Sequence, residues 1–318
     1  MKTSPYSRWH EEIGKYLAYR STYYTSRWPA QPLRLFDRFA ASHPRWTLAR
    51  AVTQWLSSGG DRNPVTRSNY LSAIRRFCEY RRRFDLDGFV PKQVMPVTAA
   101  KRSFQAYILT PEQIRTLLQK IPTLRGPPLR LARMRALLLV LYCTGLRIGE
   151  ALGLHLSDVN LKKACFQIGP SKGRIRLVPF GRDLASELNY WLQARRDAGF
   201  ILTSQTPLFE REDGRPDNRW NAEMRFNTLF RHCGLKPKRG SGRVGLRVHD
   251  LRHTFAVHRL QRWYRAGLEP GPLLPWLSAY MGHVNLIGTQ RYLRATPETL
   301  AVASRRMRRS LGFNPGDP

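Results

Sequence analysis

Apolar side chains in the first part of the chain recur at the spacing of helices rather than of strands. In residues 66–82, Tyr70, Ile74 and Phe77 fall on one helical face, while the opposite face is rich in arginine. An apolar stripe of this kind is the face that a helix buries against its neighbours. The pattern predicts a small, all-helical domain over residues 1–90.

The next segment has no sustained hydrophobic period. Residues 91–107 contain prolines and basic side chains in no regular order, which is typical of an exposed linker. After it, Thr110 can cap a helix, Pro111 suits the first helical position, and Gln113 can complete the cap. We expect a helix from here to about residue 119, and a second domain over residues 108–318.

Within this second domain the pattern alternates between buried helices and a short sheet. Residues 131–143 are apolar on nearly every face, which predicts a buried helix that stops at Thr144 and Gly145. Residues 165–168 and 175–179 are typical of two short strands around a turn, and the pattern from residue 184 is mostly helical again. The predicted fold class is mainly α with a small β-sheet (α+β), in two domains.

The charge balance indicates what kind of partner the chain needs. Lysine and arginine number 54 of the 318 residues against 22 aspartates and glutamates, a formal net charge of +32. Hydrophobic residues make up 42%, which is enough for packed cores and excludes a disordered basic tail. We therefore expect a folded protein that binds nucleic acid.

Cysteine usage and the N-terminus exclude other classes of protein. The four cysteines are scattered, without pairs or Cys/His groups at zinc-finger spacing, so we expect neither a disulfide scaffold nor a structural metal. The N-terminus lacks an apolar signal sequence, and the longest apolar run, residues 136–143, is too short to span a bilayer. We expect a cytoplasmic, nucleoid-associated bacterial protein with no membrane partner.

Two short motifs pair an arginine with a polar side chain on the same helical face. Arg147 is expected to begin a helix, with Glu150 three residues later, where its carboxylate can orient the guanidinium from behind. An ordinary Arg–Glu pair on the surface would have the same spacing. His249 and Arg252 are also three residues apart, so one helical turn can present both to a single anion.

A third motif ends in a tyrosine, and a lysine lies in the predicted hairpin. His283 precedes Tyr292 by nine residues, across a turn marked by Gly282 and a helix. A buried structural tyrosine is the alternative interpretation of Tyr292. Lys172 lies in the turn between the two predicted strands, where a merely solvated side chain is the alternative.

The order of these residues along the chain narrows the interpretation. They follow the pattern Arg, Lys, His-x-x-Arg, Gly-His and Tyr, which resembles the tyrosine recombinase family of phage integrases and chromosome-dimer resolvases. The residues are Arg147, Lys172, His249, Arg252, His283 and Tyr292. The likeness covers about residues 108–305, and over residues 1–90 it rests on charge and helical pattern alone. It implies a two-domain clamp on duplex DNA, built from a helical core-binding domain and a catalytic domain.

The resemblance implies covalent chemistry at one tyrosine. Tyr292 would attack a DNA phosphodiester to form a 3′-phosphotyrosine bond, and Lys172 would protonate the 5′ oxygen that leaves. The phosphotyrosine keeps the bond energy for the reverse step, so religation to another strand needs no ATP. No cofactor and no metal ion are implied.

The same resemblance gives the arginines and histidines their roles. Arg147 and Arg252 would stabilise the negative charge of the transition state, as magnesium does in other phosphoryl transferases. His249 would help to activate the tyrosine or hold the phosphate, and His283 would donate a hydrogen bond to a phosphate oxygen. How the two histidines divide acid and base work stays open at this point.

Assembly and context also follow from the resemblance. A homo-tetramer on synapsed recombination sites is the expected active form, and accessory recombinases are candidate partners. A helix over residues 297–312 is expected to pack on a neighbouring protomer or, alternatively, within its own chain. Gly288 stands where a second threonine is usual, and residues 262–280 are longer and richer in proline than usual. The latter segment resembles recombinases carried by transposons, which favours a mobile genetic element as the host.

Two other functions fit parts of the pattern. A type IB topoisomerase shares the tyrosine and arginine chemistry but relaxes supercoils as a monomer. A catalytically idle DNA-binding regulator would keep the fold without the reaction, although the complete set of six residues argues against it. The DNA target and the direction of the reaction depend on side chains in the DNA grooves that a sequence cannot orient.

Overall fold

The chain forms two compact units, Met1–Gln105 and Ala106–Pro318. The computed structural model describes residues 5–23, 29–59, 64–92, 106–171, 174–237 and 244–283. Most of the segment expected to be a linker, residues 91–107, lies outside these ranges. The linker and its bounds therefore stay predictions, and each unit is considered by itself.

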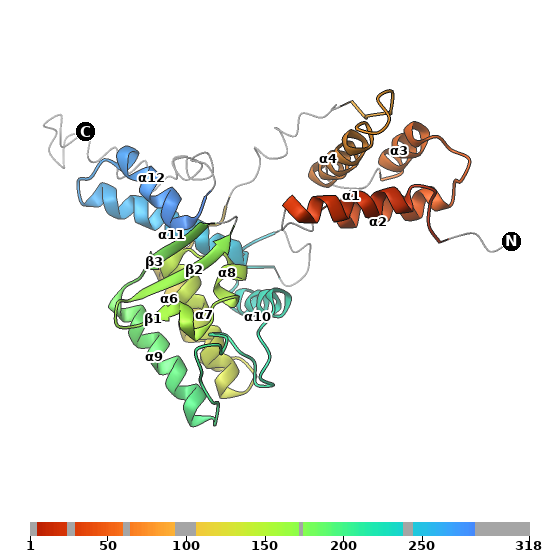
Figure 1. Cartoon of the computed structure of the whole chain (residues 1–318). Coiled ribbons are helices and arrows are strands. Elements are labelled where there is room, and N and C mark those ends of the chain that lie inside the picture. Colours follow the sequence, from red (N-terminus) through yellow and green to blue (C-terminus); the bar gives the residue numbers. More distant parts are fainter. Residues whose placement is uncertain are drawn as a thin grey trace, which may run out of the picture. The chain divides into compact units, whose positions relative to one another are not determined.

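In its described residues the N-terminal unit contains helices and no strand (Figure 1). The helices are α1 (His10–Tyr23), α2 (Ala30–Ala41), α3 (Leu48–Ser57) and α4 (Pro64–Arg81). The helix predicted over residues 66–82 is confirmed as α4. Its polar face leaves Arg76 exposed to solvent, as the pattern predicts, and Arg82, directly after the helix, is exposed as well.

Aromatic side chains fill the core of this unit. The Trp55 ring stacks on Tyr70 with 5.3 Å between ring centroids, and it meets Phe36 edge-on at 5.6 Å. Trp55, Phe36 and Phe77 are fully buried. Large rings contribute much buried area per residue, so short helices suffice to enclose this core.

The second unit is mainly helical with one small sheet, which confirms the predicted fold class. Its helices are α6 (Pro111–Lys120), α7 (Pro128–Thr144), α8 (Ile148–Leu152), α9 (Arg182–Asp197), α10 (Arg219–His232), α11 (Val248–Arg265) and α12 (Pro270–Met281). Single 3₁₀ turns, η1 (Ile121–Thr123) and η2 (Leu156–Asp158), complete the helical elements described. The Pro-rich segment thus forms the end of α11 and a helix with Pro275 inside it.

The sheet is antiparallel, with the strand order β1-β2-β3. The strands are β1 (Val159–Asn160), β2 (Cys165–Ser171) and β3 (Arg174–Pro179). The predicted hairpin is therefore confirmed, and its strands run further toward the turn than expected, with Ile168 opposite Arg176 and Ser171 opposite Arg174. Strand β1 was not predicted, because two residues are too few to show an alternation.

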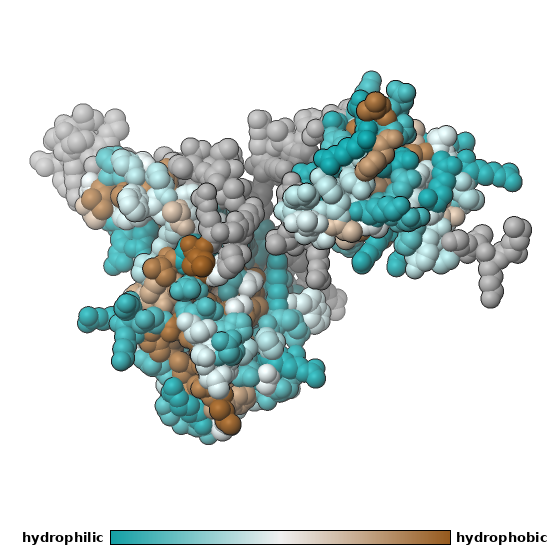
Figure 2. Space-filling model, viewed as in Figure 1, coloured by the Kyte–Doolittle hydropathy of each residue, from teal (hydrophilic) through white to brown (hydrophobic). Residues whose placement is uncertain are grey.

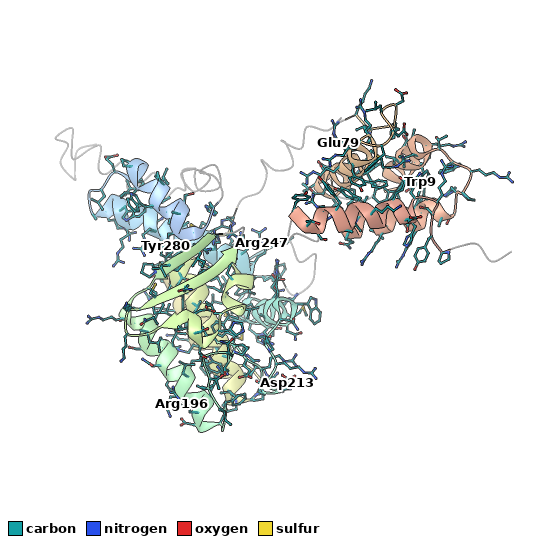
Figure 3. All side chains as sticks on the ribbon, in the orientation of Figure 1. Trp9, Glu79, Arg196, Asp213, Arg247 and Tyr280 are labelled. Atoms are coloured by element: carbon teal, nitrogen blue, oxygen red, sulfur yellow. The ribbon has the colours of Figure 1, made fainter. Side chains whose placement is uncertain are left out.

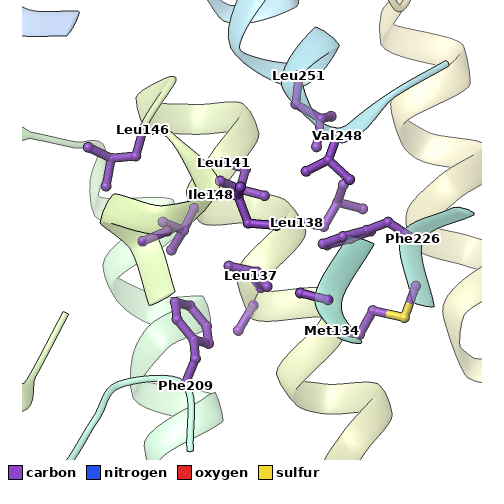
Figure 4. Packing of buried hydrophobic residues seen from close by; sticks show 14 of the residues in the cluster. Met134, Leu137, Leu138, Leu141, Leu146, Ile148, Phe209, Phe226, Val248 and Leu251 are labelled. Carbon is purple, nitrogen blue, oxygen red and sulfur yellow. The ribbon is translucent and has the colours of Figure 1, made fainter. Parts of the chain in front are cut away.

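The core of this unit surrounds α7, which packs against α9 and α11. Leu137, Leu138 and Leu141 from α7 lie close to Phe226 from α10 and Leu251 from α11 (Figure 4). The buried helix predicted over residues 131–143 is confirmed, and it starts earlier because a proline suits the first turn of a helix. This packing fixes the end of α7 and the start of α11, where two of the arginine motifs lie.

Helix α6 begins with the cap that the sequence predicts. The Thr110 hydroxyl accepts a hydrogen bond from the Gln113 backbone N–H at 3.2 Å, and the Gln113 side chain accepts one from the Thr110 N–H at 3.0 Å. Two donors at the helix start are thereby satisfied. The capping box is confirmed.

Candidate active site

The first motif starts with a sharp turn at Gly145. This glycine ends α7 with φ at +63°, and a Cβ atom there would lie 2.4 Å from the Phe255 ring of α11. Only glycine allows both the left-handed backbone and this close approach. The chain therefore reverses directly after α7, and Arg147 stands at the start of α8, as predicted.

Glu150 holds Arg147 from behind. The Arg147 Nη1 donates to Glu150 Oε1 at 2.8 Å, and the Arg147 backbone N–H donates to Oε2 at 2.9 Å. A third hydrogen bond runs from Arg147 Nη2 to the Gly282 carbonyl at 3.2 Å. The Arg147 side chain remains 38% exposed, so its guanidinium is both oriented and accessible.

Arg252 is buried and bound to the main chain. Its side chain is 2% exposed; Nη1 donates to the Gly145 carbonyl at 2.7 Å and Nη2 to the Met281 carbonyl at 2.6 Å. These acceptors are the ends of α7 and α12. The second motif therefore ties the first motif to the third.

Asp250 sets the first turn of α11. Its buried carboxylate accepts hydrogen bonds from the Arg247 backbone N–H at 2.9 Å and from the Arg247 Nε at 3.0 Å. Figure 3 shows Arg247 at the start of this helix. The turn carries His249 at the protein surface, with its ring 4.8 Å from the buried His253 ring and nearly perpendicular to it.

His249 is neutral over the physiological range. Desolvation by the surrounding protein atoms, and the positive charges of Arg252 and Arg147, lower its pKa from 6.5 to about 4. One edge of the ring also reaches solvent. A neutral imidazole can accept a proton or a hydrogen bond, which a charged one cannot.

The third motif begins where α12 ends. Gly282 has φ at +66°, and the His283 backbone N–H donates to the Ser278 carbonyl at 3.0 Å. The carbonyls of Gly282 and Met281 accept hydrogen bonds from Arg147 and Arg252 respectively. The structure thus brings Arg147 and Arg252 to the backbone directly before His283, although the three residues come from separate segments.

Two predicted catalytic residues lie outside the described residues. These are Lys172, between Ser171 of β2 and Arg174 of β3, and Tyr292. The same holds for Gly288 and for the helix predicted over residues 297–312. Their roles stay predictions.

Sequence reasoning missed Arg176. Its Nη2 donates to Glu150 Oε2 at 2.9 Å and its Nε donates to the Tyr280 carbonyl at 3.0 Å, while its side chain is 13% exposed. The apolar neighbours Ile175 and Leu177 are each 64% exposed, which reverses the usual burial pattern of a strand. Arg176 alternates with Ile175 and Leu177 along β3, so it lies on the other face of the strand. This alternation was the sequence signal that could have drawn attention to Arg176.

Two negative findings concern the described residues. No three His, Cys, Asp or Glu side chains among them gather as metal ligands would. No helix in the same ranges has the length and apolar character needed to cross a membrane.

A known protein family matches more than half of the chain. The model of the phage integrase family matches residues 108–299. The chain belongs to the phage integrase family. Since the matched range contains every residue of the predicted catalytic set, the expected membership of the tyrosine recombinases is confirmed.

Relatives of this integrase-family chain have similar lengths. It is 32% identical over 263 residues to a putative integrase/recombinase, y4rB, of Sinorhizobium fredii, covering 80% of this chain and 82% of the relative. It is 31% identical over 247 residues to the tyrosine recombinase XerD of Mycobacterium leprae, covering 74% of this chain and 71% of the relative. These relatives support the enzyme class, DNA cleavage and rejoining.

A solved structure shows the same fold. The integrase of the transposon Tn1549, in complex with a circular intermediate DNA, superposes with a TM-score of 0.66 at 19% identity, over 93% of this chain and 98% of that one. At this identity the likeness concerns the fold alone. It agrees with the mainly helical architecture described above.

Proposed function

We propose that this chain is a site-specific DNA recombinase that exchanges strands through a 3′-phosphotyrosine bond at Tyr292. The observation that carries the proposal is the meeting of three motifs, in which the Arg147 and Arg252 guanidiniums bind the backbone beside His283. Fixed cations of this kind suit a phosphate whose negative charge grows during the reaction. Family membership supplies the reaction class.

The arginines would bind the scissile phosphate. Arg147 keeps an accessible edge, and its orientation is set by Glu150 before any ligand arrives. Arg252 contributes positive charge from a buried position, where electrostatic interactions are stronger than in water. Preorganised charges need no reorganisation when the transition state forms, so their stabilisation applies in full.

Two proton transfers would accompany the exchange of bonds at phosphorus. The Tyr292 oxygen attacks phosphorus, a new P–O bond to the tyrosine forms, and the bond to the 5′ oxygen breaks. Lys172 gives a proton to the 5′ oxygen, and the proton of the tyrosine hydroxyl passes to neutral His249, directly or through water. His283 would donate a hydrogen bond to a non-bridging oxygen. The reverse steps rejoin the DNA.

The partner would be duplex DNA, to which a net charge of +32 gives strong attraction. A tetramer on two synapsed sites is the proposed active form, with accessory recombinases as further candidates. We also propose that the gene belongs to a mobile element, because a relative is named an integrase/recombinase and a transposon integrase shares the fold. Such an enzyme would work at the nucleoid in the cytoplasm.

The test starts from a randomised duplex library, because the DNA site is unknown. Library duplexes with a nick near their centre are incubated with the protein, and adducts that survive denaturing electrophoresis are sequenced. The wild type should yield adducts that share a sequence. The protease-digested adduct should carry its DNA on the peptide that contains Tyr292.

Tyr292→Phe is the matched control, since it removes one hydroxyl and keeps the charged groups. It should bind the selected duplex with nearly unchanged affinity and form no adduct. An adduct from this variant at the wild-type rate would mean that another residue is the nucleophile. Strand exchange between two duplexes of the selected sequence then distinguishes a recombinase from an enzyme that only relaxes supercoils.

A further inference from the structure

Arg176 links the first motif, through Glu150, and the end of α12 before His283 to strand β3, and it has no task in the mechanism proposed above. We propose that Arg176 is a positioning residue, which fixes the β2–β3 hairpin against Arg147 and Gly282 so that Lys172 meets the leaving oxygen. This inference rests on the proposed function. Arg176 itself touches neither DNA nor the reacting atoms in this scheme.

The contacts of Arg176 run in two directions. Nη2 binds Glu150, the carboxylate that also holds Arg147, and Nε binds the carbonyl of Tyr280, near the end of α12. Figure 3 shows Tyr280 between this helix and the strands. The flat, forked guanidinium can serve two acceptors in different directions, whereas a lysine ammonium lacks this fixed geometry.

Gly282 fits the guanidinium closely. A Cβ atom at this position would lie 2.7 Å from both Cζ and Nη1 of Arg176, and the guanidinium cannot retreat without leaving its two acceptors. Arg176 therefore packs against the residue that precedes His283 and that accepts the hydrogen bond from Arg147. The strand and the third motif are in direct contact.

The electrostatics agree with a permanent ion pair. Burial by itself raises the pKa of Glu150, but hydrogen bonds from Arg176 and from the Arg147 backbone, with the charges of both arginines, outweigh burial and lower it. Glu150 is thus ionised and binds both cations. A charged, buried link of this kind costs much to break on one side.

Loss of Arg176 should disturb the β2–β3 hairpin more than it disturbs the position of Arg147. Arg147 retains its own bonds to both Glu150 oxygens and to the Gly282 carbonyl. Strand β3 would lose its charged link to α8 and α12, and Lys172 is four residues before Arg176 in the same hairpin. The expected defect is poor protonation of the leaving group, with the phosphate still bound.

The test compares two leaving groups on the selected nicked duplex. One substrate has the normal 5′ oxygen at the scissile phosphate, and the other has a bridging 5′ sulfur, which leaves as a thiolate without a proton. Arg176→Lys should slow single-turnover cleavage of the oxygen substrate by about tenfold to a hundredfold. With the sulfur substrate, its rate should return to within about threefold of the wild type.

Controls separate the possible causes. Lys172→Ala should be rescued by sulfur in the same way, and Arg147→Ala should be slow with both substrates. Arg115→Lys, an exposed change on α6, should match the wild type with both. Thermal midpoints are measured for each variant, and Arg176→Gln replaces Arg176→Lys if the latter is unfolded at the assay temperature.

An equal defect of Arg176→Lys on both substrates, or no defect on either, overturns the proposal. If both Arg176 variants unfold, Arg176 is a folding residue and the proposal also fails. If the wild type forms no adduct with either substrate, the proposed function itself is wrong. If Lys172→Ala is slow and sulfur does not rescue it, the role of Lys172 is wrong, and the proposal for Arg176 falls with it.

Discussion

The two units of the chain keep their arginines in different environments. In the N-terminal unit, Arg76 and Arg82 are exposed to solvent, outside an aromatic core. In the catalytic unit, Arg252 and Arg176 are largely buried and bound to carbonyls or a carboxylate. The same residue type is thus solvated at these positions of one unit and held in a fixed geometry at these positions of the other.

Burial alone does not mark an arginine as catalytic. Arg195 is 1% exposed, yet its Nη1 donates to the Pro207 carbonyl at 3.0 Å and its partner is Glu210, in a loop that contributes no residue to the predicted catalytic set. The arginines of the candidate site differ in their acceptors, which belong to the motifs themselves. The buried Arg195 therefore differs from the arginines of the candidate site in where its acceptors lie.

The largest effect expected is that of salt on DNA binding. If six or more phosphates are contacted, affinity should fall by about a thousandfold between 50 and 200 mM salt, because counterions are released on binding. The single-turnover cleavage rate of the saturated complex should change by less than about twofold, since buried charges are poorly screened. Titrations and cleavage assays at matched salt concentrations measure both. Equal salt sensitivity of DNA binding and of cleavage would contradict the distinction between exposed and buried arginines.

Removal of each catalytic arginine should separate reactivity from stability. Arg147→Ala and Arg252→Ala should each slow cleavage by about a hundredfold or more, because each deletes a positive charge at the proposed phosphate site. Arg252→Ala should also lower the free energy of unfolding by about 2–4 kcal/mol, more than Arg147→Ala, since it leaves two buried carbonyls without their donors, whereas Glu150 keeps Arg176 when Arg147 is lost. Denaturant unfolding gives the second quantity. A similar loss of stability in Arg147→Ala would contradict its description as an accessible side chain.

Gly145→Ala should destabilise the catalytic unit without touching any charge. The new Cβ atom would collide with the Phe255 ring, and alanine would adopt a positive φ. We expect a loss of roughly 2–4 kcal/mol in the free energy of unfolding. Gly149→Ala is the matched control, because a Cβ there meets no atom within 4 Å. If both variants unfold alike, the close contact with Phe255 is unimportant.

The smallest effect expected concerns pH and His249. Because burial by neighbouring atoms and the charges of Arg252 and Arg147 lower its pKa below the usual 6.5, His249 is neutral at neutral pH, and cleavage should show no inflection near 6.5 that depends on it. Rates for the wild type and His249→Gln should therefore run parallel around neutral pH. The folded protein disfavours protonation of this ring, so the free energy of unfolding should fall as pH drops from 6.5 toward 4. A histidine whose pKa is raised by a carboxylate would give the opposite trend. An inflection near 6.5 that vanishes in His249→Gln would refute the lowered pKa.

Local signals made parts of the fold predictable. The cap at Thr110, the apolar run of α7 and the turn at Gly145 depend on residues within a few positions of one another. The family pattern then predicted Arg147, Arg252 and His283, whose segments do meet. The catalytic set as a whole stays a prediction, because Lys172 and Tyr292 lie outside the described residues.

Long-range partners were not predictable in the same way. Nothing near Arg176 in the sequence indicates that its acceptors are Glu150 and Tyr280, which lie on other elements. Likewise, the carbonyls that bind Arg252 carry no side-chain signal, since every residue has one. Strand β1 is likewise defined by its pairing with strand β2 and not by a pattern in its own two residues. Such contacts depend on tertiary packing.

The two carbonyls that hold Arg252 lie 107 residues before and 29 residues after it in the chain. During synthesis, a chain that has reached Arg252 but not yet Met281 already carries much of the basic surface, but its buried guanidinium still lacks one acceptor. The environment of Arg252 is therefore complete only after the segment that contains Met281 has emerged and folded. If the proposed function holds, a product truncated before Met281 should bind DNA without cleaving it.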